Sequence, residues 1–478
     1  MAIALAILFA FAAAVRLPSM HALAAGQDED YFSVPGLAIL RGGPPAIPYV
    51  PSRDPAGVFF RADESLFSLP PAFFYLEAVA YSLFESSVFF ARCVSLLAGL
   101  AAAAAVCLLA ERWFPNRHSG LWAALLFLFS RPFLFPATTA RPDILCAALL
   151  LWTAVIIEYP RFLGSLRRQL FAGLLLGFAL LAHPFAVVGA VLFAGAILIP
   201  ADRAFSFLHR VRTCLVFAIA ALLAFSLWLP LILRHPDLFQ AQFGNNVVRR
   251  AGPGLLERFL SPWESLAVQL RQFRELAGDW QAALFAVALL VVAAMGFRSR
   301  SFRPAVFAGA AALLLVVAEG THTSKGYWCF PIGFLAACAG GAIASLGRVS
   351  PFAGLVAFAL LLPGSGLRAS YVYFQHRGDP DYVHPIAVGK LLVEIPPGAR
   401  YLVDVGSVFE FHRAGRDTTL ALEIAPFFQA KGLPYDYLVV TRTGREQRLP
   451  EVLGAGRLVR RIGDPADPYR VFVEVWAP

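Results

Sequence analysis

Charged residues are scarce in this sequence. Only 15% of the 478 residues are Asp, Glu, Lys or Arg, whereas 59% are hydrophobic. An ordinary soluble domain has about 25% charged and about 45–50% apolar residues. This shortage of charge excludes a large soluble protein and predicts that most of the chain faces lipid or other lipid-embedded helices.

The sequence also lacks any C-x-x-C pair, and its six cysteines all lie in apolar segments. This arrangement indicates neither a disulfide framework nor a zinc site, so we interpret the cysteines as small core residues. The net charge of +9 would suit a nucleic-acid partner. The basic residues instead stand in short clusters between apolar runs, which excludes nucleic acid and indicates membrane orientation.

No basic residue precedes the first apolar segment, residues 2–15. A secretory signal peptide needs a basic region there, although Ala22-Leu23-Ala24-Ala25 resembles a cleavage site. We therefore expect a first transmembrane helix that continues to about Leu17 or beyond. It would deliver the acidic residues that follow to the far side of the membrane.

Long apolar runs follow one another through the chain, as expected of membrane-spanning helices. They cover residues 88–110, 119–136, 142–158, 169–183, 185–200, 212–233, 281–297, 303–319, 327–347 and 351–366. With the first segment they predict a polytopic α-helical membrane protein with about eleven transmembrane helices.

Arginine clusters in alternate connections give the orientation. The clusters are Arg112 and Arg117; Arg161, Arg167 and Arg168; Arg203, Arg210 and Arg212; Arg298, Arg300 and Arg303; and Arg348. All fall on one side if the N-terminus is cytoplasmic, as the positive-inside rule requires. We expect a multi-pass protein of the inner (plasma) membrane whose C-terminus is extracytoplasmic.

Two external loops and a C-terminal domain complete the predicted organisation. The transmembrane domain covers residues 1–366 and contains the external loops 27–87 and 234–280. Residues 367–478 have the composition of a soluble domain, within the usual size range. Its strands are expected at 401–405, 437–441 and 471–475, with a helix over 420–428, giving a small extracytoplasmic α/β domain.

The acidic stretch after the first segment, Asp28-Glu29-Asp30-Tyr31-Phe32, is the most informative part of the chain. Further charged residues stand at external helix ends: Arg141, Asp143, Glu319, His322 and Lys325. Such residues face a cavity or a partner, because exposure to hydrocarbon costs several kcal/mol. A carboxylate accepts a proton from a hydroxyl nucleophile, and Arg or Lys stabilises a phosphate leaving group.

The ordered motifs resemble a known family, the integral-membrane glycosyltransferases of the GT-C superfamily, and within it the protein O-mannosyltransferases and the lipid A aminoarabinose transferase. Asp28-Glu29-Asp30-Tyr31-Phe32 is similar to the family's Asp-Glu-x-aromatic pattern. Pro70-Pro71-Ala72-Phe73-Phe74-Tyr75, within a predicted amphipathic helix over 70–81, resembles Pro-Pro-Leu-x-Tyr. Phe90-Ala91-Arg92-Cys93-Val94-Ser95 resembles Ala-Arg-x-x-Ser, and Arg141-Pro142-Asp143 resembles Arg-x-Asp.

The resemblance implies a GT-C-like fold and transfer of a sugar from a polyprenyl-phosphate donor, with inversion, on the extracytoplasmic face. Asp28 takes the position of the family's base, with Glu29 beside it. The candidate substrate-binding residues are Asp30, Arg61, Arg141, Asp143, His322 and Lys325. The partners are the lipid bilayer, the polyprenyl-phosphate sugar (hexosyl or pentosyl) and an acceptor that is a lipid, a glycan or a protein.

The sequence departs from the family pattern at two positions. Leu69 stands where the family often has His or Lys before Pro-Pro, and His183-Pro184 replaces a frequent Lys after the fifth span. The acidic stretch could also bind a divalent cation. No partner carboxylate is identified, so we predict no metal and no cofactor and leave a divalent cation open.

Simpler interpretations compete with the catalytic one. The acidic stretch suits a solvated loop, Arg141 with Asp143 suits a helix-start ion pair, His183 a structural polar residue, and Lys325 a snorkelling side chain. At the level of function, a transporter or flippase of a lipid-linked glycan and an inactive GT-C-like partner protein remain alternatives. The sequence has no convincing internal repeat, which disfavours a transporter.

Overall fold

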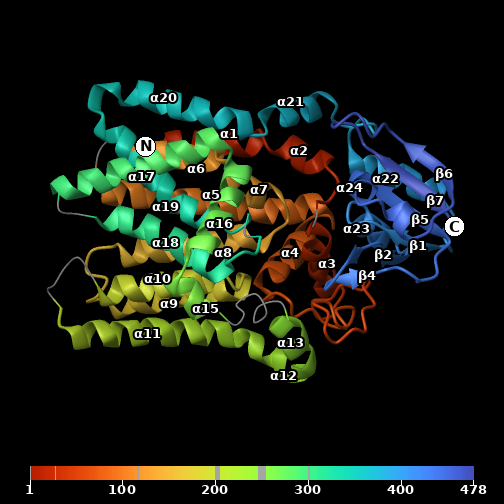
Figure 1. Cartoon of the computed structure of the whole chain (residues 1–478), viewed down its shortest axis with the longest axis horizontal. Helices are drawn as coiled ribbons and strands as arrows, with labels where there is room; N and C mark the ends of the chain where they lie inside the picture. Colours follow the sequence, from red (N-terminus) through yellow and green to blue (C-terminus); the bar gives the residue numbers. More distant parts are fainter. Residues whose placement is uncertain are drawn as a thin grey trace.

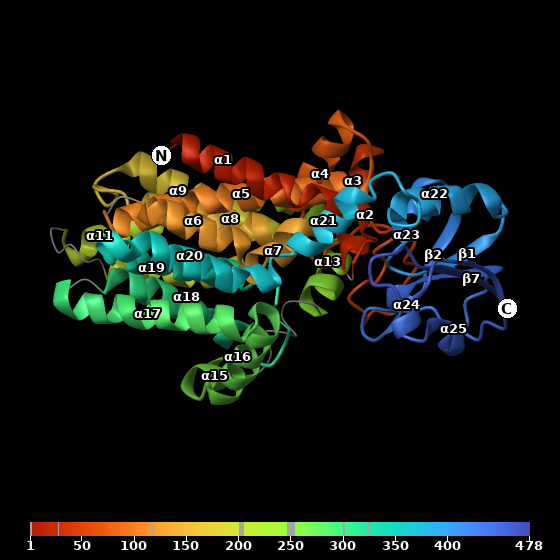
Figure 2. The same cartoon turned by 90° about the horizontal axis from the view of Figure 1, so that it is seen from above.

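The computed structural model describes residues 2–26, 28–115, 118–199, 205–245, 254–299, 302–323 and 325–478. Gln27 of the acidic loop and Arg117, Arg203 and Arg300 of the orientation clusters lie outside these ranges. A bundle of long helices forms one end of the molecule, and a small sheet with its own helices forms the other (Figures 1 and 2).

The N-terminal half of the helical part contains α1 to α10. Their bounds are α1 Ala2–Ala14, α2 Leu17–Ala22, α3 Glu29–Leu40, α4 Ala72–Leu83, α5 Val88–Trp113, α6 Ser119–Phe129, α7 Arg131–Thr138, α8 Pro142–Ile157, α9 Leu166–Ala182 and α10 Ala186–Leu198. The predicted amphipathic helix over 70–81 appears as α4, which begins two residues later with Pro71 as its N-cap residue.

The second half contains α11 to α21. Their bounds are α11 Phe207–Phe225, α12 Leu229–Arg234, α13 Pro236–Phe243, α15 Leu255–Leu260, α16 Trp263–Ala277, α17 Asp279–Ser299, α18 Arg303–Glu319, α19 Cys329–Ser345, α20 Ser350–Leu361 and α21 Leu367–Gln375, with short 3-10 turns η1 Ser226–Trp228, η3 Gly347–Val349 and η4 Leu362–Gly364.

Within the described residues, five helical stretches are long and apolar enough to cross a membrane. They are Ile3–Ala22, Val88–Trp113, Phe207–Arg234, Asp279–Phe297 and Gly347–Gly364. The pair α6 and α7, bent by 63°, makes a sixth if it counts as one broken span. The predicted number of about eleven is therefore not confirmed, because apolar helices such as α8, α10 and α19 are shorter than the roughly 20 residues of a full span.

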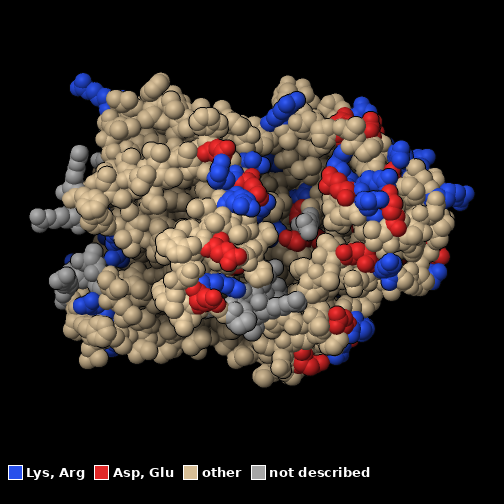
Figure 3. All heavy atoms as spheres, viewed as in Figure 1, with Lys and Arg blue, Asp and Glu red and all other residues tan. Residues whose placement is uncertain are grey.

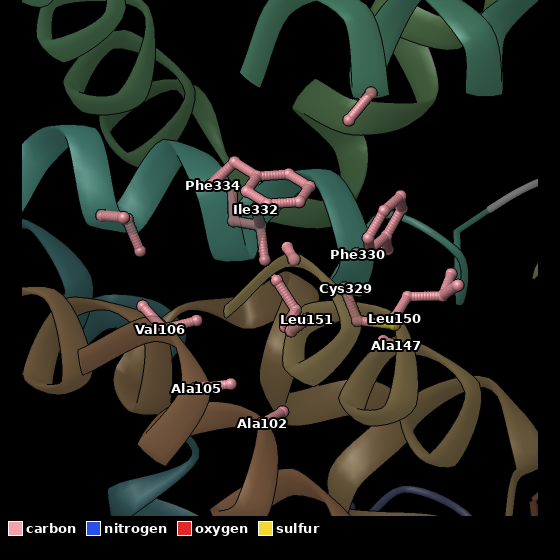
Figure 4. Close-up of a cluster of buried hydrophobic side chains, with 14 of the residues drawn as sticks. Ala102, Ala105, Val106, Ala147, Leu150, Leu151, Cys329, Phe330, Ile332 and Phe334 are labelled. Carbon is pink, nitrogen blue, oxygen red and sulfur yellow. The ribbon is translucent and has the colours of Figure 1, made fainter. Parts of the chain in front are cut away.

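The centre of the bundle is packed from small and branched side chains. Ala102 and Val106 of α5, Leu151 of α8 and Phe330 of α19 belong to one buried cluster (Figure 4). Close helix approach is explicit at Gly177 of α9, where an added Cβ would lie 2.3 Å from the Ala221 carbonyl of α11. Small residues allow such contacts where lipid supplies no hydrophobic drive between helices. Four of the cysteines, Cys107, Cys146, Cys329 and Cys338, are buried, and all six are free thiols, as predicted.

Charge is distributed unevenly over the surface. In the face drawn in Figure 3, Lys, Arg, Asp and Glu gather over the C-terminal end and the middle of the molecule. The outer surface of the bundle is mostly uncharged there, as expected for helices that face lipid. The division of the molecule into a membrane part and a polar end follows the composition of the chain.

The C-terminal region is an α/β fold. Its elements are α22 His384–Glu394, β1 Arg400–Val403, α23 Val408–Arg413, β2 Asp417–Leu420, β3 Glu423–Ile424, β4 Phe428–Gln429, β5 Tyr437–Thr441, α24 Arg442–Glu446, α25 Leu449–Val452, β6 Arg457–Ile462 and β7 Val473–Ala477. The five-stranded sheet has the order β2-β1-β5-β7-β6, with β1 parallel to β2 and β5, and β7 antiparallel to its neighbours.

The three predicted strands are present, but the predicted helix over 420–428 is wrong. Leu420 ends β2, and β3 pairs antiparallel with β4 in a small hairpin. Pro426 interrupts the helical pattern, since proline removes a backbone donor and clashes with the preceding turn. This hairpin segment contacts the first external loop, because the Pro426 carbonyl accepts a hydrogen bond from the Val58 amide at 3.0 Å.

The first external loop and the C-terminal region share one hydrophobic cluster. Tyr49 and Phe59 of the loop belong to it together with Val403 of β1. The Leu420 amide donates to the Tyr49 carbonyl at 2.9 Å, and the Phe59 and Phe427 rings lie 5.7 Å apart. The C-terminal sheet is thus seated on the loop that carries the acidic stretch. The domain limits of 366 and 367 and the loop limits stay predictions.

Candidate functional site

Asp28 stands at the start of α3, at the edge of a cavity. It is the N-cap residue of α3 and has a left-handed backbone with φ of 80°. A non-glycine residue adopts this region rarely, and such residues cluster at functional sites. The side chain is 35% exposed, and its Oδ2 lies 2.5 Å from Arg141 Nη1. Among the described residues, no donor meets Oδ1.

Glu29, the next residue, lies in a closed ion pair. Its side chain is 1% exposed and that of Arg92 is 3% exposed. Arg92 donates two hydrogen bonds of 2.8 and 2.7 Å to the two carboxylate oxygens. The amides of Gly26 and Ala140 add one each at 2.7 Å. Burial alone would raise the pKa of Glu29, but the charge of Arg92 and these donors outweigh burial and hold the pKa below its ordinary value.

Asp30 is buried and does not line the cavity. Its Oδ1 has no hydrogen-bond partner among the described residues. Its carbonyl accepts a bond from the Tyr49 hydroxyl at 2.5 Å. Burial, reinforced by the negative charge of Asp28, raises the pKa of Asp30 to about 8. Three consecutive acidic residues therefore have three different environments.

Arg141 and Asp143 come from the start of α8. Because Pro142 disfavours helical geometry in the residue before it, Arg141 is extended and its side chain leaves the helix axis. Its Nε donates to Asp143 Oδ2 at 2.6 Å, and its guanidinium carbon lies 5.2 Å from the centre of the Phe32 ring. Arg141 thus links a fully buried carboxylate, Asp143, to the partly exposed carboxylate of Asp28.

His183 lies next to Asp143 and so adds a fourth residue to the group formed by Asp28, Arg141 and Asp143. It precedes Pro184, which keeps it extended at the end of α9. Its Nδ1 accepts the Phe185 amide at 3.2 Å, so the ring proton is assigned to Nε2, which lies 3.6 Å from Asp143 Oδ1. The ring also contacts Tyr327, with centroids 4.7 Å apart. The sequence motif Arg-x-Asp therefore continues into a residue from another helix.

The cavity has a volume of about 580 Å³. Its walls come from the start of α3, the first external loop, the second half of α7, the start of α8, the end of α9, the segment between α18 and α19, and the hairpin of the C-terminal region. Residues that carry its polar character are Asp28, Tyr31, Arg141, His183, His322 and Lys325. Phe32, Phe59, Phe135 and Phe427 supply aromatic walls. A carboxylate, several cations and aromatic surfaces thus meet in one space large enough for a sugar and a phosphate.

Two predicted residues from the segment between α18 and α19 reach this cavity. Lys325 Nζ lies 3.2 Å from Glu275 Oε2, and both side chains are largely exposed. The His322 carbonyl accepts bonds from Gln269 at 2.8 Å and Gln272 at 3.1 Å, which fix the segment against α16. Gly326 lies against the ion pair, because an added Cβ would be 3.1 Å from Asp143 Oδ2.

Arg61 lies outside the cavity. It donates to Glu64 with bonds of 2.8 and 2.5 Å and to Asp237 at 3.1 Å. All three side chains are on the surface. These contacts join the first external loop to the start of α13, so the structure brings Arg61 to a loop junction and away from Asp28.

Arg92, Tyr31 and Tyr327 were not predicted as functional residues. Arg92 belongs to α5, a candidate span, and a charge within a span indicates a buried partner. That signal pointed to a role, yet its partner Glu29 is 63 positions earlier and invisible to local patterns. Tyr31 did carry a signal, as the aromatic residue of the Asp-Glu-x-aromatic pattern. Tyr327 carries none, since aromatic residues are common throughout this chain.

Metal binding gains no geometric support from the part of the chain that is described. Within those residues, no group of three or more His, Cys, Asp or Glu side chains is arranged to hold a metal ion. Arg92 and backbone amides occupy the oxygens of Glu29, and Arg141 pairs with Asp28 Oδ2. The predictions of no cofactor and of an open divalent site stay untested.

Comparison with known proteins places this arrangement in context. Residues 68–231, about a third of the chain, match the family model described as dolichyl-phosphate-mannose-protein mannosyltransferase. No curated protein matches the chain significantly in sequence. The motif order that suggested the family therefore lies partly inside the matched region and partly before it.

Solved structures share the fold over nearly the whole chain. ArnT from Cupriavidus metallidurans, bound to undecaprenyl phosphate, is 15% identical with a TM-score of 0.61, covering 98% of this chain and 97% of its own. Its apo state gives a TM-score of 0.62. The Archaeoglobus fulgidus oligosaccharyltransferase, in complex with zinc and sulfate, is 14% identical with a TM-score of 0.56, covering 98% and 72%. The family model and the shared fold confirm the predicted resemblance to the GT-C membrane glycosyltransferases.

Proposed function

We propose that this chain is a membrane glycosyltransferase that moves a sugar from a polyprenyl-phosphate donor to an acceptor hydroxyl or amine. The observation that carries the proposal is the placement of Asp28. Its carboxylate lines the cavity with one oxygen paired to Arg141 and the other without a donor among the described residues. The ArnT structure was solved with undecaprenyl phosphate, which supports the same class of donor here.

The proposed reaction is a single displacement with inversion. Asp28 Oδ1 accepts the proton of the acceptor hydroxyl or amine, while the acceptor atom forms a bond to the anomeric carbon. The bond between that carbon and the phosphate oxygen breaks, and polyprenyl phosphate leaves with the electron pair. Arg141 and Lys325 stabilise the phosphate charge that develops, and the enclosed cavity supplies rate through positioning.

The other acidic residues have supporting roles in this proposal. Glu29 is a positioning residue, because its four hydrogen bonds leave no lone pair directed at the cavity. By holding Gly26 and Ala140 it fixes the two segments that carry Asp28 and Arg141. Asp143 pairs with Arg141 and orients its guanidinium, and His183 lies beside Asp143 on the other side. The donor enters on the side of the C-terminal region, which is extracytoplasmic in the predicted orientation.

The proposal is tested in cells of the source organism that lack the protein. Polyprenyl-linked lipids are measured by untargeted mass spectrometry in the null strain and after rescue with wild type, Asp28→Asn or Asp63→Asn. Asp63 is a matched control, since it also pairs with an arginine, Arg53, at 2.8 Å but lies outside the cavity.

We expect one polyprenyl-phosphate sugar to accumulate in the null strain and with Asp28→Asn, and to return to the wild-type level with Asp63→Asn. Rescue by Asp28→Asn equal to wild type would remove Asp28 as the base and favour a transport or scaffold role. Unchanged lipids in every strain would contradict a polyprenyl-linked donor.

A further inference from the structure

A groove on the outer surface of the bundle runs between α10 and α18, far from Asp28. Its volume is about 480 Å³, and its walls are almost wholly apolar. Val191 of α10 and Ile199, the C-cap residue of α10, mark its extent on one side, and Leu313 lies on its α18 side. Arg303, the first residue of α18, is the charged residue in its lining.

A second hollow, lined by residues from the ends of α5 and α8 and the start of α18, continues this groove. These helix ends lie at the end of the bundle opposite the C-terminal sheet (Figure 1). The second hollow has a volume of about 380 Å³, and it shares Ala196 and Arg303 with the groove. Arg112, Glu158 and Arg161 also line it. An apolar channel therefore opens directly into a pocket that contains three guanidinium groups and one carboxylate.

The pocket keeps an excess of positive charge. The Glu158 carboxylate forms an ion pair with Arg303 at 2.7 Å and accepts a hydrogen bond from the Trp113 indole at 2.9 Å. Arg112 donates its Nε to the Glu158 carbonyl at 2.6 Å, so its two terminal nitrogens stay available. Among the described residues, the guanidinium of Arg161 has no hydrogen-bond or ion-pair partner. Two formal positive charges are thus left beside the mouth of the groove.

The length of the groove matches one leaflet of a bilayer. From Arg303 to Leu314, eleven helical steps of about 1.5 Å give roughly 16 Å. Half of the roughly 30 Å hydrocarbon core of a membrane is about the same length. A single acyl chain would therefore run along the groove while its head group reaches the arginine pocket at the membrane surface.

We propose that this groove and pocket bind one anionic phospholipid from the leaflet opposite the C-terminal region. That leaflet is cytoplasmic in the orientation predicted from the arginine clusters, where anionic lipids meet basic residues. One acyl chain lies between α10 and α18, and the head-group phosphate pairs with Arg112 and Arg161. A lipid without net charge would not neutralise the excess positive charge of the arginine pocket. A small soluble anion would leave the apolar groove without an occupant.

The full-length protein offers two site variants with matched controls. Gly195→Leu places a side chain in the groove, where an added Cβ meets no atom within 4 Å. Gly309→Leu is its control, since Gly309 is equally open on α18 but does not line the groove. Arg161→Gln removes the unpaired charge, and Arg348→Gln removes an exposed arginine from the connection before α20.

The measurement is native mass spectrometry of the delipidated protein with added phosphatidylglycerol, phosphatidylcholine or undecaprenyl phosphate. We expect wild type to bind one phosphatidylglycerol in preference to phosphatidylcholine. Arg161→Gln should weaken it about fivefold, the effect of one basic residue near an anionic lipid. Gly195→Leu should abolish it, and both controls should bind as wild type.

Three results would overturn the proposal. Equal binding of phosphatidylglycerol and phosphatidylcholine would make the groove a nonspecific lipid contact. Wild-type binding by Gly195→Leu would place the lipid elsewhere. Displacement of phosphatidylglycerol by undecaprenyl phosphate, lost in Gly195→Leu, would assign the groove to the tail of the donor lipid.

Discussion

Asp28 Oδ2 lies 2.5 Å from Arg141 Nη1, although the two residues are 113 positions apart in the chain. This ion pair joins the start of α3 to the start of α8 at the edge of the cavity. It occupies one carboxylate oxygen of a residue that lines the cavity.

Replacing Asp28 by Asn should lower turnover of the identified donor by about 10²- to 10⁴-fold, the usual contribution of a general base. The amide still accepts a hydrogen bond from Arg141 but takes up no proton. Binding of undecaprenyl phosphate, measured by native mass spectrometry, should stay within about twofold of wild type, because the amide oxygen keeps a hydrogen bond to Arg141 and Asp28 does not contact the phosphate in the proposed reaction. Full activity in Asp28→Asn would assign the proton to another acceptor.

Replacing Glu29 by Gln should lower the free energy of unfolding by about 3–5 kcal/mol, because Arg92 is then left buried without its counter-charge. Thermal and denaturant unfolding of the purified protein measure this loss. Glu64→Gln is the control, since the Glu64 pair with Arg61 is exposed and such pairs contribute about 0–1 kcal/mol. Equal stability of the two variants would contradict the structural role of Glu29.

Asp30 should make the stability of the protein fall as pH rises. Its pKa is raised to about 8 in the folded state, so the folded protein binds a proton that the unfolded chain has lost. The stabilisation is complete below the unfolded pKa of about 3.9 and is lost as pH rises through about 8.

The variant Asp30→Asn should flatten this dependence and be more stable than wild type at pH 9. Its activity should remain, since the amide resembles the protonated acid. Unfolding measured from pH 5 to 9 tests the first expectation. Identical pH slopes in the two proteins would show that Asp30 is not protonated in the fold, and loss of activity with a flattened slope would restore its predicted part in substrate binding.

Lys325→Gln should weaken binding of undecaprenyl phosphate by roughly ten- to a hundredfold, as expected for one hydrogen bond to a charged group. The comparison is Arg274→Gln on the neighbouring helix α16, where Arg274 pairs with Asp279 outside the cavity. If Lys325 only reaches toward the membrane surface, Lys325→Gln would change the affinity for undecaprenyl phosphate as little as Arg274→Gln does.

Several features of the fold follow directly from local patterns. The strand at Tyr437–Thr441 was predicted at its observed bounds, because a run of β-branched and aromatic residues suits a buried strand in the middle of a sheet. The segment 420–428 was predicted wrongly as a helix. Its apolar spacing is compatible with a helix, but Pro426 and contacts to the first external loop decide for a hairpin. Such contacts are tertiary and leave no local trace.

The sequence alone determined that this chain is a membrane protein with an acidic stretch after its first apolar segment, because hydropathy and charge act residue by residue. It also determined the family resemblance, through the order of short motifs. Only the tertiary structure decided which environment each of Asp28, Glu29 and Asp30 occupies. Successive residues of a helix are rotated about its axis by about 100°. Neighbours in sequence therefore meet different surroundings: Asp28 lines the cavity, Glu29 pairs with Arg92, and Asp30 is buried. For Asp28 and Glu29, the partner comes from a segment more than 60 positions away in the chain.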